Sequence, residues 1–359
     1  MSSPMDDFGL NFEQIRILYS FEYFLVQEDI TKETEFIKKQ LKRRWLNLWR
    51  ESVENFLSSI ASNDLERNDC FLYTDYSSLE ESVERMKQFL ERSRPLYSIL
   101  LELSLFIIYT PFGTHEDEQF RNLKLSEAFR PKIIEQIGFF ANELGIEIGY
   151  VKLFKTDYKM WSDVITGSNN NPFKVIIGGL IGGAVLAAVA AAIAIPILVP
   201  LLAPILAPGL SGAAAISVVL AALGGGAIAA GGFGMAGGMA VIVGGGAILG
   251  AGAGTGVGSL FANSPDLAVR EAAKFLVTFN DIILPQKDVE KQEIAHSARE
   301  IIRRQRNTIN ELEGQISEMQ MNRDSNSEQI NNLQKVVKYF RKSLEISQNL
   351  LKEFLQIYG

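Results

Sequence analysis

The most informative feature of this 359-residue chain is a stretch that lacks charge. Residues 175–265 contain no Asp, Glu, Lys, Arg or His, and they hold 22 of the 30 glycines. A helix buried in a soluble core seldom has more than about 14 apolar residues in a row, whereas about 20 suffice to cross a bilayer. Soluble helices also keep one polar face, and none can be drawn here at any period. The absence of charge therefore predicts a segment that lies in lipid, or that is covered until it reaches lipid.

Cysteine and histidine are also scarce. Cys70 is the single cysteine, which excludes an intramolecular disulfide and therefore a small fold stapled by disulfides. The two histidines, His115 and His296, are far apart in the sequence, and with one cysteine they cannot complete a four-ligand zinc site. The N-terminal sequence MSSPMDDFGL lacks the basic patch and apolar run of a signal peptide. We therefore expect no metal, no cofactor and no conventional secretion signal.

Basic domains and catalytic motifs are lacking as well. The formal charge of −7 argues against a nucleic-acid partner, because dedicated nucleic-acid binders usually carry a basic domain. Residues 232–237 (GFGMAG) match the glycine pattern of dinucleotide-binding loops, but no strand is evident before them and the next acid is Asp266. In a segment so rich in glycine this match is expected by chance. The sequence predicts that the protein is not an enzyme.

Prolines divide the uncharged segment. Residues 175–195 are long enough for one membrane crossing, and residues 213–230 and 235–261 predict two further apolar helices. Between the first two helices a proline recurs at every fourth residue. Each proline removes an amide donor and clashes with the preceding turn, so we expect a bend or a re-entrant stretch there. These prolines are Pro196, Pro200, Pro204 and Pro208.

Glycines repeat at a spacing of four residues in the first and third predicted apolar helices. On a helix this spacing forms a smooth groove, which lets a second backbone approach closely in lipid. The alternative is a flexible apolar linker without defined packing. The glycines predicted to pack helices together are Gly178 and Gly182 in the first helix and Gly246, Gly250, Gly254 and Gly258 in the third.

The N-terminal region, residues 1–174, predicts several soluble-type helices. One spans about residues 32–62, with apolar side chains at intervals of three or four and a crowd of basic residues. The basic face could rest on anionic lipid headgroups or pair with acidic neighbours in water. The candidate headgroup contacts are Lys38, Lys39, Lys42 and Arg43.

Capping signals mark two more helices in this region. Residues 77–80 (SSLE) match a capping box that begins a helix toward Tyr109, with a kink at Pro95. A helix over residues 126–144 ends at Gly145, where a left-handed cap is expected. Residues 145–154 alternate enough in polarity to predict a short strand.

The C-terminal region, residues 266–359, begins with a predicted membrane-proximal helix that is stopped by Pro285. Apolar or small residues then follow one heptad phase from Ala298 to Phe354, which is typical of a coiled coil or a long helical bundle. At the polar residues 322–327 (NRDSNS) the helix either continues or reverses into a hairpin, and the unbroken phase favours continuation. The side chains expected to face a partner helix are Leu312, Ile316, Leu333 and Leu344.

The sequence thus predicts an all-α protein in which long helices flank a central Gly/Ala-rich membrane segment. This order of parts resembles the cytolysin A-like α-helical pore-forming toxins, including the haemolytic enterotoxin components. The resemblance implies a soluble helical bundle whose apolar head is folded away before membrane contact.

The expected function is insertion into a lipid bilayer and its permeabilisation by an oligomer, either of this chain alone or with a related helical subunit. We expect the protein at a membrane, reached from a soluble cytoplasmic or released form. The alternative is a coiled-coil scaffold that is permanently anchored in the membrane and forms no pore.

Overall fold

The computed structural model describes residues 10–61, 63–109, 119–120, 122–167, 261, 265–321 and 327–358. Every regular element in these residues is helical, which confirms the all-α fold. Nearly all of the uncharged segment, with its prolines and glycines, lies outside the described residues. Among the helices that are described, none combines the length and the apolar character needed to span a bilayer.

The described residues form two compact units. The N-terminal unit comprises residues 10–153, and the C-terminal unit comprises residues 154–167 and those from 261 to 358. The sequence placed a boundary at residue 174, whereas in the structure the chain changes unit within helix α8 (Gly149–Thr166). Most of α8 therefore packs with the helices that follow the uncharged segment.

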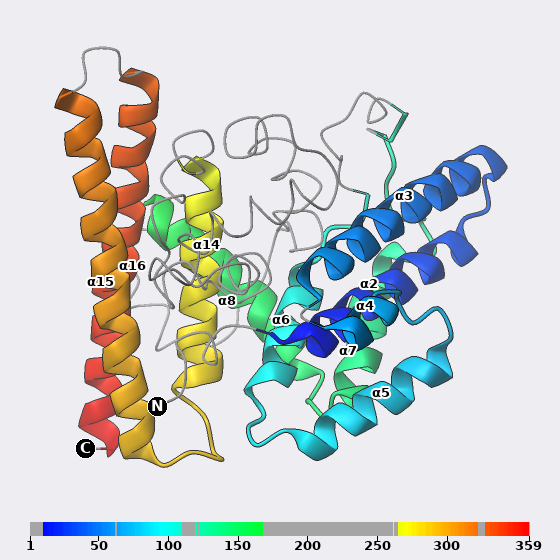
Figure 1. The fold of residues 1–359 in the computed structure, drawn as a ribbon, viewed down its shortest axis with the longest axis horizontal. Coiled ribbons are helices and arrows are strands. Elements are labelled where there is room, and N and C mark those ends of the chain that lie inside the picture. The colour runs from blue at the N-terminus through cyan, green and yellow to red at the C-terminus, as the bar shows by residue number, and fades with distance from the viewer. Residues whose placement is uncertain are drawn as a thin grey trace. The chain divides into compact units, whose positions relative to one another are not determined.

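Helix α2 (Phe12–Lys32) lies at the centre of the N-terminal unit (Figure 1). It starts at a capping box in which Asn11 and Gln14 bond each other's backbone amides. The helices around it are α3 (Phe36–Ile60), α5 (Tyr76–Phe89), α6 (Arg94–Leu105) and α7 (Ile133–Glu143), joined by the short α4 (Asp64–Asn68) and a 3-10 turn, η2 (Arg130–Lys132).

Aromatic side chains fill the space around α2. Tyr19 makes edge-to-face contacts with Trp49 and Phe56 of α3, with ring centroids 6.2 and 6.1 Å apart. On another side of α2, the Phe21 ring lies 4.8 Å from that of Phe140 in α7. These rings are essentially inaccessible to solvent. The large apolar area that they bury is the main stabilising contribution of such a core.

The two helices over residues 76–105 differ in detail from the prediction. Asp75, rather than Ser77, caps α5, because its carboxylate accepts from the backbone amide of Ser78. Pro95 occupies the first turn of α6, where its missing amide hydrogen costs nothing. The chain therefore ends one helix and begins another, instead of kinking a single helix.

The region around Gly145 shows one confirmed and one wrong prediction. Gly145 has φ +73°, the left-handed conformation expected after α7. The strand predicted over residues 145–154 is wrong, because α8 begins at Gly149. The alternation of polar and apolar residues over 145–154 is short. The apolar residues Val151, Phe154 and Trp161 recur with the period of a helix and are buried on one of its faces.

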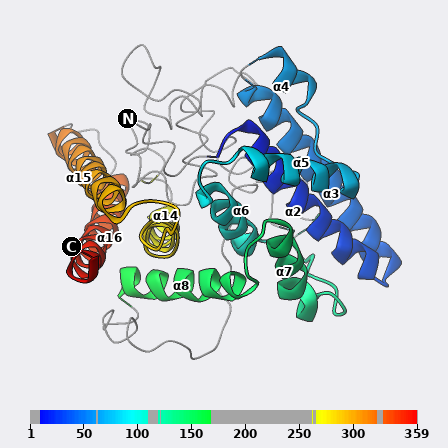
Figure 2. The same ribbon diagram turned by 90° about the horizontal axis from the view of Figure 1, so that it is seen from below.

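Four elements complete the C-terminal unit: α14 (Pro265–Val277), the π-helix η5 (Thr278–Ile283), α15 (Lys291–Met321) and α16 (Ser327–Tyr358). Helix α14 with η5 confirms the helix predicted over residues 266–284. Helix α14 packs along α16, and α8 crosses beside α14 (Figure 2).

The long C-terminal helix is a hairpin. The prediction that the helix continues through residues 322–327 is wrong, because α15 and α16 lie side by side and antiparallel (Figure 1). Gln305 bonds Ser347 and Glu313 bonds Arg341, so partners move backward along α16 as residue numbers rise along α15. The same heptad pattern is compatible with a continuous helix and with a hairpin, because each arm of a hairpin also buries the face that carries the apolar residues.

Candidate functional site

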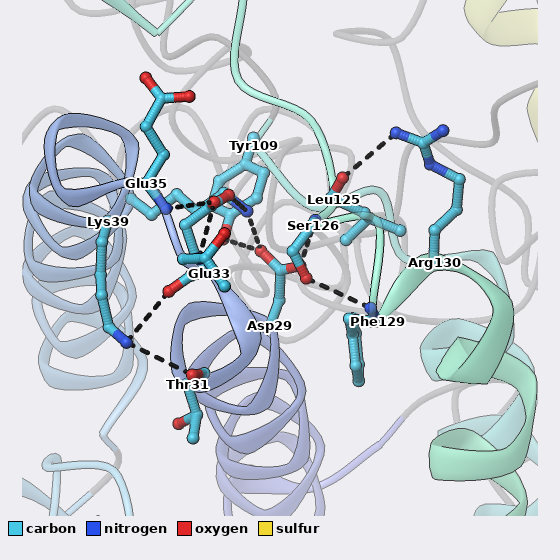
Figure 3. Close-up of polar contacts among 12 residues, drawn as sticks. Asp29, Thr31, Glu33, Glu35, Lys39, Tyr109, Leu125, Ser126, Phe129 and Arg130 are labelled. Carbon is cyan, nitrogen blue, oxygen red and sulfur yellow. Dashed lines mark hydrogen bonds and ion pairs between the residues drawn. The ribbon is translucent and has the colours of Figure 1, made fainter.

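A buried charged network joins the end of α2 to α3 and to two loops of the N-terminal unit (Figure 3). The Lys42 ammonium in α3 lies 2.6 Å from a carboxylate oxygen of Asp29 and 2.9 Å from one of Glu33. Asp29 also accepts hydrogen bonds from the Tyr109 hydroxyl and, at 2.7 Å, from the Ser126 backbone amide. Lys42 and Asp29 are both fully buried.

Electrostatics favour the charged form of Glu33 in this network. Burial is the largest single influence on Glu33 and opposes its ionisation, but the hydrogen bond and the charge of Lys42, together with hydrogen bonds from the backbone amides of Glu35 and Thr34, outweigh burial and lower the Glu33 pKa. Burial, and then the negative charge of Asp29, raise the pKa of Tyr109, so its hydroxyl stays a donor to that carboxylate. Tyr109 also has φ +67°, a strained backbone conformation that its surroundings must enforce.

This network corrects one candidate for lipid contact. The Lys42 side chain is enclosed by protein, so in this conformation it cannot reach a lipid headgroup. Its buried charge is neutralised by Asp29 and Glu33, as burial of an ammonium group requires. The other three basic residues lie at or near the protein surface. Lys38 pairs with Glu35, Lys39 donates to backbone carbonyls at the end of α2, and Arg43 is exposed.

A pair of carboxyl groups lies in the C-terminal unit. Asp157 lies on α8 and Asp281 on η5, the charge of Asp157 acts on Asp281, and Asp281 is 8% exposed. Burial raises the pKa of both groups, and the negative charge of Asp157 raises that of Asp281 further. Sequence reasoning missed this pair. The available signal was an acid within an apolar helical face, at Asp157, and another within the apolar run at Asp281.

Asp281 lies on an unusual element, the π-helix η5. A π-helix is rare, and single π-turns are frequent at functional sites. The carboxylate of Asp281 accepts from the Asn280 side-chain amide at 2.6 Å through Oδ1, whereas its other oxygen, Oδ2, is buried without a donor. If Asp157 and Asp281 were both ionised, neither carboxylate could donate a hydrogen bond to the other.

A polar layer crosses the α15–α16 hairpin. The Gln305 amide donates to the Ser343 hydroxyl at 3.0 Å, and the Ser347 hydroxyl donates to the Gln305 carbonyl at 2.9 Å. All three residues are fully buried. Of the four residues predicted to face a partner helix, Leu312, Ile316 and Leu333 are buried and Leu344 is half-buried.

Substituting Ser343→Ala should destabilise the hairpin by about 1–3 kcal/mol, because the buried Gln305 amide loses its acceptor. Replacing the whole layer, as Gln305→Leu with Ser343→Ala and Ser347→Ala, should recover most of that loss, since no buried polar group then lacks a partner. Urea denaturation followed by circular dichroism measures both. Equal destabilisation of the single and triple variants would contradict the coupling of these groups.

Other candidate chemistry gains no support from geometry. Among the described residues, no three His, Cys, Asp or Glu side chains are grouped so as to hold a metal ion. Cys70 is buried and free, His296 is exposed, and His115 lies outside the described residues. The predicted glycine groove and proline bend also lie outside them.

Comparison of the chain with protein-family models, curated proteins and solved structures found no match.

Proposed function

We propose that the protein inserts residues 175–265 into a lipid bilayer and permeabilises it as an oligomer. The observation that carries this proposal is the complete absence of ionisable side chains from that segment. Burying a charge in hydrocarbon is expensive, and a soluble domain of similar length keeps charged residues on its wet faces. The segment has the composition of a membrane-inserted one throughout.

The described helices on either side of the segment have buried apolar faces and charged exposed faces, as helices in contact with water do. Helix α8 precedes the segment and α14 follows it, and both bury apolar residues within the C-terminal unit. Helices α3 and α15 carry charged side chains on exposed faces. The chain thus combines two folded helical units with one segment of a different character.

The start of α3 offers a first contact with the membrane surface. Phe36 and Ile37 are 74% and 67% exposed, although both side chains are large and apolar. Lys38 and Lys39 follow them directly, and Arg43 lies further along the same helix. Exposed aromatic and aliphatic side chains beside basic ones are typical of surfaces that rest on anionic headgroups.

The hairpin weakens the alternative of a membrane-anchored coiled-coil scaffold. A scaffold needs an apolar stripe that is open to another chain. Here Leu312 and Leu333 are buried within the chain itself, and the Gln305 layer is satisfied within the hairpin. Oligomer contacts are therefore proposed for the glycine groove.

Substituting Gly250→Leu with Gly254→Leu should abolish dye release from liposomes and oligomerisation, while the helical units stay folded. Two leucines would fill the groove and hold a neighbouring backbone away. The matched control is Gly252→Leu with Gly256→Leu, which adds the same side chains to the opposite face of the predicted helix.

The control variant should release dye as the unmodified protein does. Circular dichroism and cross-linking in lipid report folding and oligomer formation. Full dye release by the Gly250/Gly254 variant would remove the packing role. Failure of the unmodified protein to release dye from any liposome would overturn the permeabilising function itself.

A further inference from the structure

Two large apolar side chains project into water where α2 and α3 meet. Phe36 and Ile37 are the first two residues of α3, and they are 74% and 67% exposed. Figure 1 shows the connection between the two helices at one end of this antiparallel pair. Apolar residues that are exposed singly need no explanation, whereas a contiguous apolar patch rimmed by polar residues is typical of a contact surface.

Hydrogen bonds hold the connection between α2 and α3 in one shape (Figure 3). The Glu33 carboxylate accepts from the backbone amides of Thr34 and Glu35, both at 3.0 Å. The Lys39 ammonium donates to the backbone carbonyl oxygens of Thr31 and Glu33, at 3.3 and 3.2 Å, at the end of α2. The exposed pair is thus carried by a fixed turn, which lowers the conformational entropy lost on binding.

The buried Lys42 holds the same turn from within. Its ammonium lies between the carboxylates of Asp29 and Glu33, at 2.6 and 2.9 Å, so the second turn of α3 is bound to the end of α2. Lys38 and Arg43, on the same helix, are exposed. One basic side chain therefore holds the shape of the connection, and others are left to contact a partner.

This part of the N-terminal unit is basic, although the protein is acidic. Residues 32–44 hold six basic and two acidic residues, whereas the whole chain has a formal charge of −7. Arg43 follows Phe36 by seven residues, which is two helical turns, so both lie on one face of α3. Lys38 pairs with Glu35 at the surface, where water screens the interaction. The exposed apolar pair is thus flanked by positive charge.

We propose that residues 32–44, the α2–α3 corner, bind the anionic headgroups of a lipid bilayer. Phe36 and Ile37 enter the boundary between headgroups and acyl chains, while Lys38 and Arg43 contact the phosphate groups. Aromatic and aliphatic side chains beside Lys and Arg are the composition of helices that lie in this boundary. This use of the corner rests on the proposed function, and it names the lipid that the protein meets first.

The contact at the corner is weak by itself. A single acyl chain gives only marginal, reversible membrane binding, and stable association takes a second signal. In this protein the second signal is the uncharged segment, residues 175–265. The corner therefore selects the bilayer and orients the protein on it, and the segment retains the protein there.

Substituting Phe36→Trp places an indole at the corner of the full-length protein, where its fluorescence reports contact with lipid. The probes are liposomes of phosphatidylcholine alone and of phosphatidylcholine mixed with phosphatidylglycerol, both brominated on the acyl chains near the headgroups. Bromine quenches an indole that it touches. Trp45, Trp49 and Trp161 are buried, and the unmodified protein gives their contribution. We expect the added indole to be quenched by the mixed liposomes and much less by phosphatidylcholine alone. Equal quenching by both, or by neither, would overturn the site.

Substituting Phe36→Ser with Ile37→Ser should slow binding of the full-length protein to the mixed liposomes about tenfold, because two apolar contacts are lost. The matched control is Leu65→Ser with Phe71→Ser. It removes side chains that are 79% and 60% exposed and whose closest charged neighbours in the sequence are acids. The control should bind as the unmodified protein does. Equal slowing in both variants would contradict a specific role of the corner.

Substituting Lys38→Glu with Arg43→Glu tests the charge of the corner, and it also tests the site if the serine variant does not fold. The preference for mixed liposomes over phosphatidylcholine should disappear. The matched control, Lys335→Glu with Lys338→Glu, changes the net charge equally at exposed residues of α16 and should keep the preference. A preference that survives in the corner variant would exclude anionic lipid as its partner.

Dye release by the same proteins separates the corner from the proposed function. Quenching by the mixed liposomes without dye release from any protein would leave the corner standing and defeat permeabilisation. Dye release by the serine variant at the rate of the unmodified protein would overturn the corner and leave permeabilisation standing. Self-association without lipid that the serine variant abolishes would assign the corner to a second copy of the chain instead.

Discussion

Deleting residues 175–265 and joining the flanks through a short Gly/Ser linker should leave a folded protein that no longer associates with liposomes. The described helices bury many apolar side chains that lie outside the deleted segment, among them Tyr19, Phe140, Phe275 and Phe354. The deletion removes the uncharged segment and keeps these side chains, so we expect both helical units to stay folded. Circular dichroism reports folding, and liposome flotation reports membrane association.

The intact chain decides between insertion and permanent anchoring, because both predict the same result for the deletion. A protein that inserts on contact should be recoverable from the aqueous fraction before it meets liposomes, with its apolar segment covered. Recovery of the full-length chain from membranes alone, from synthesis onward, would favour the anchored scaffold. Strong flotation of the deletion variant would show that membrane affinity resides elsewhere in the chain.

Substituting Lys42→Met should destabilise the N-terminal unit by about 3–5 kcal/mol, the usual cost of removing one partner from a buried ion pair. Methionine keeps the apolar stem of the side chain but leaves Asp29 buried without its cation. Urea denaturation followed by tryptophan fluorescence is a suitable measurement, because Trp45 and Trp49 lie on the same helix.

Lys38→Met is the matched control, because Lys38 lies one turn earlier on α3 and pairs with Glu35 at the surface. Water screens that pair, so its loss should leave the denaturation midpoint unchanged. A Lys42 variant as stable as the Lys38 variant would show that the buried network contributes little to folding.

Short sequence patterns correctly predicted those features of the fold that depend on residues close together in the sequence. Gly145 follows a helix because glycine adopts a left-handed conformation without strain. The heptad phase that includes Leu312 and Leu333 predicted two long amphipathic arms. It did not reveal the reversal between them, because the same face is buried whether the partner is another chain or the returning arm.

The buried charges could not be predicted, because their partners are distant in sequence. In the sequence Lys42 is one of several basic residues on a helix, and nothing local separates it from Lys38 or Lys39. Its burial depends on how α2 and α3 meet, which brings Asp29 and Glu33 to it. The closeness of Asp157 to Asp281 is likewise a consequence of tertiary packing, although each acid lies within an apolar stretch of the sequence.

The central position of α2 has a consequence for synthesis on the ribosome. Its side chains are covered by segments that are made much later, as the contacts of Phe21 with Phe140 and of Asp29 with Ser126 show. At about 5–20 residues per second, roughly 6–24 s separate the synthesis of Phe21 from that of Phe140. Throughout that interval the face of α2 that carries Phe21 lacks the partner that it has in the folded protein. We therefore expect this face of α2 to stay exposed in the nascent chain until the residues that cover it have been made.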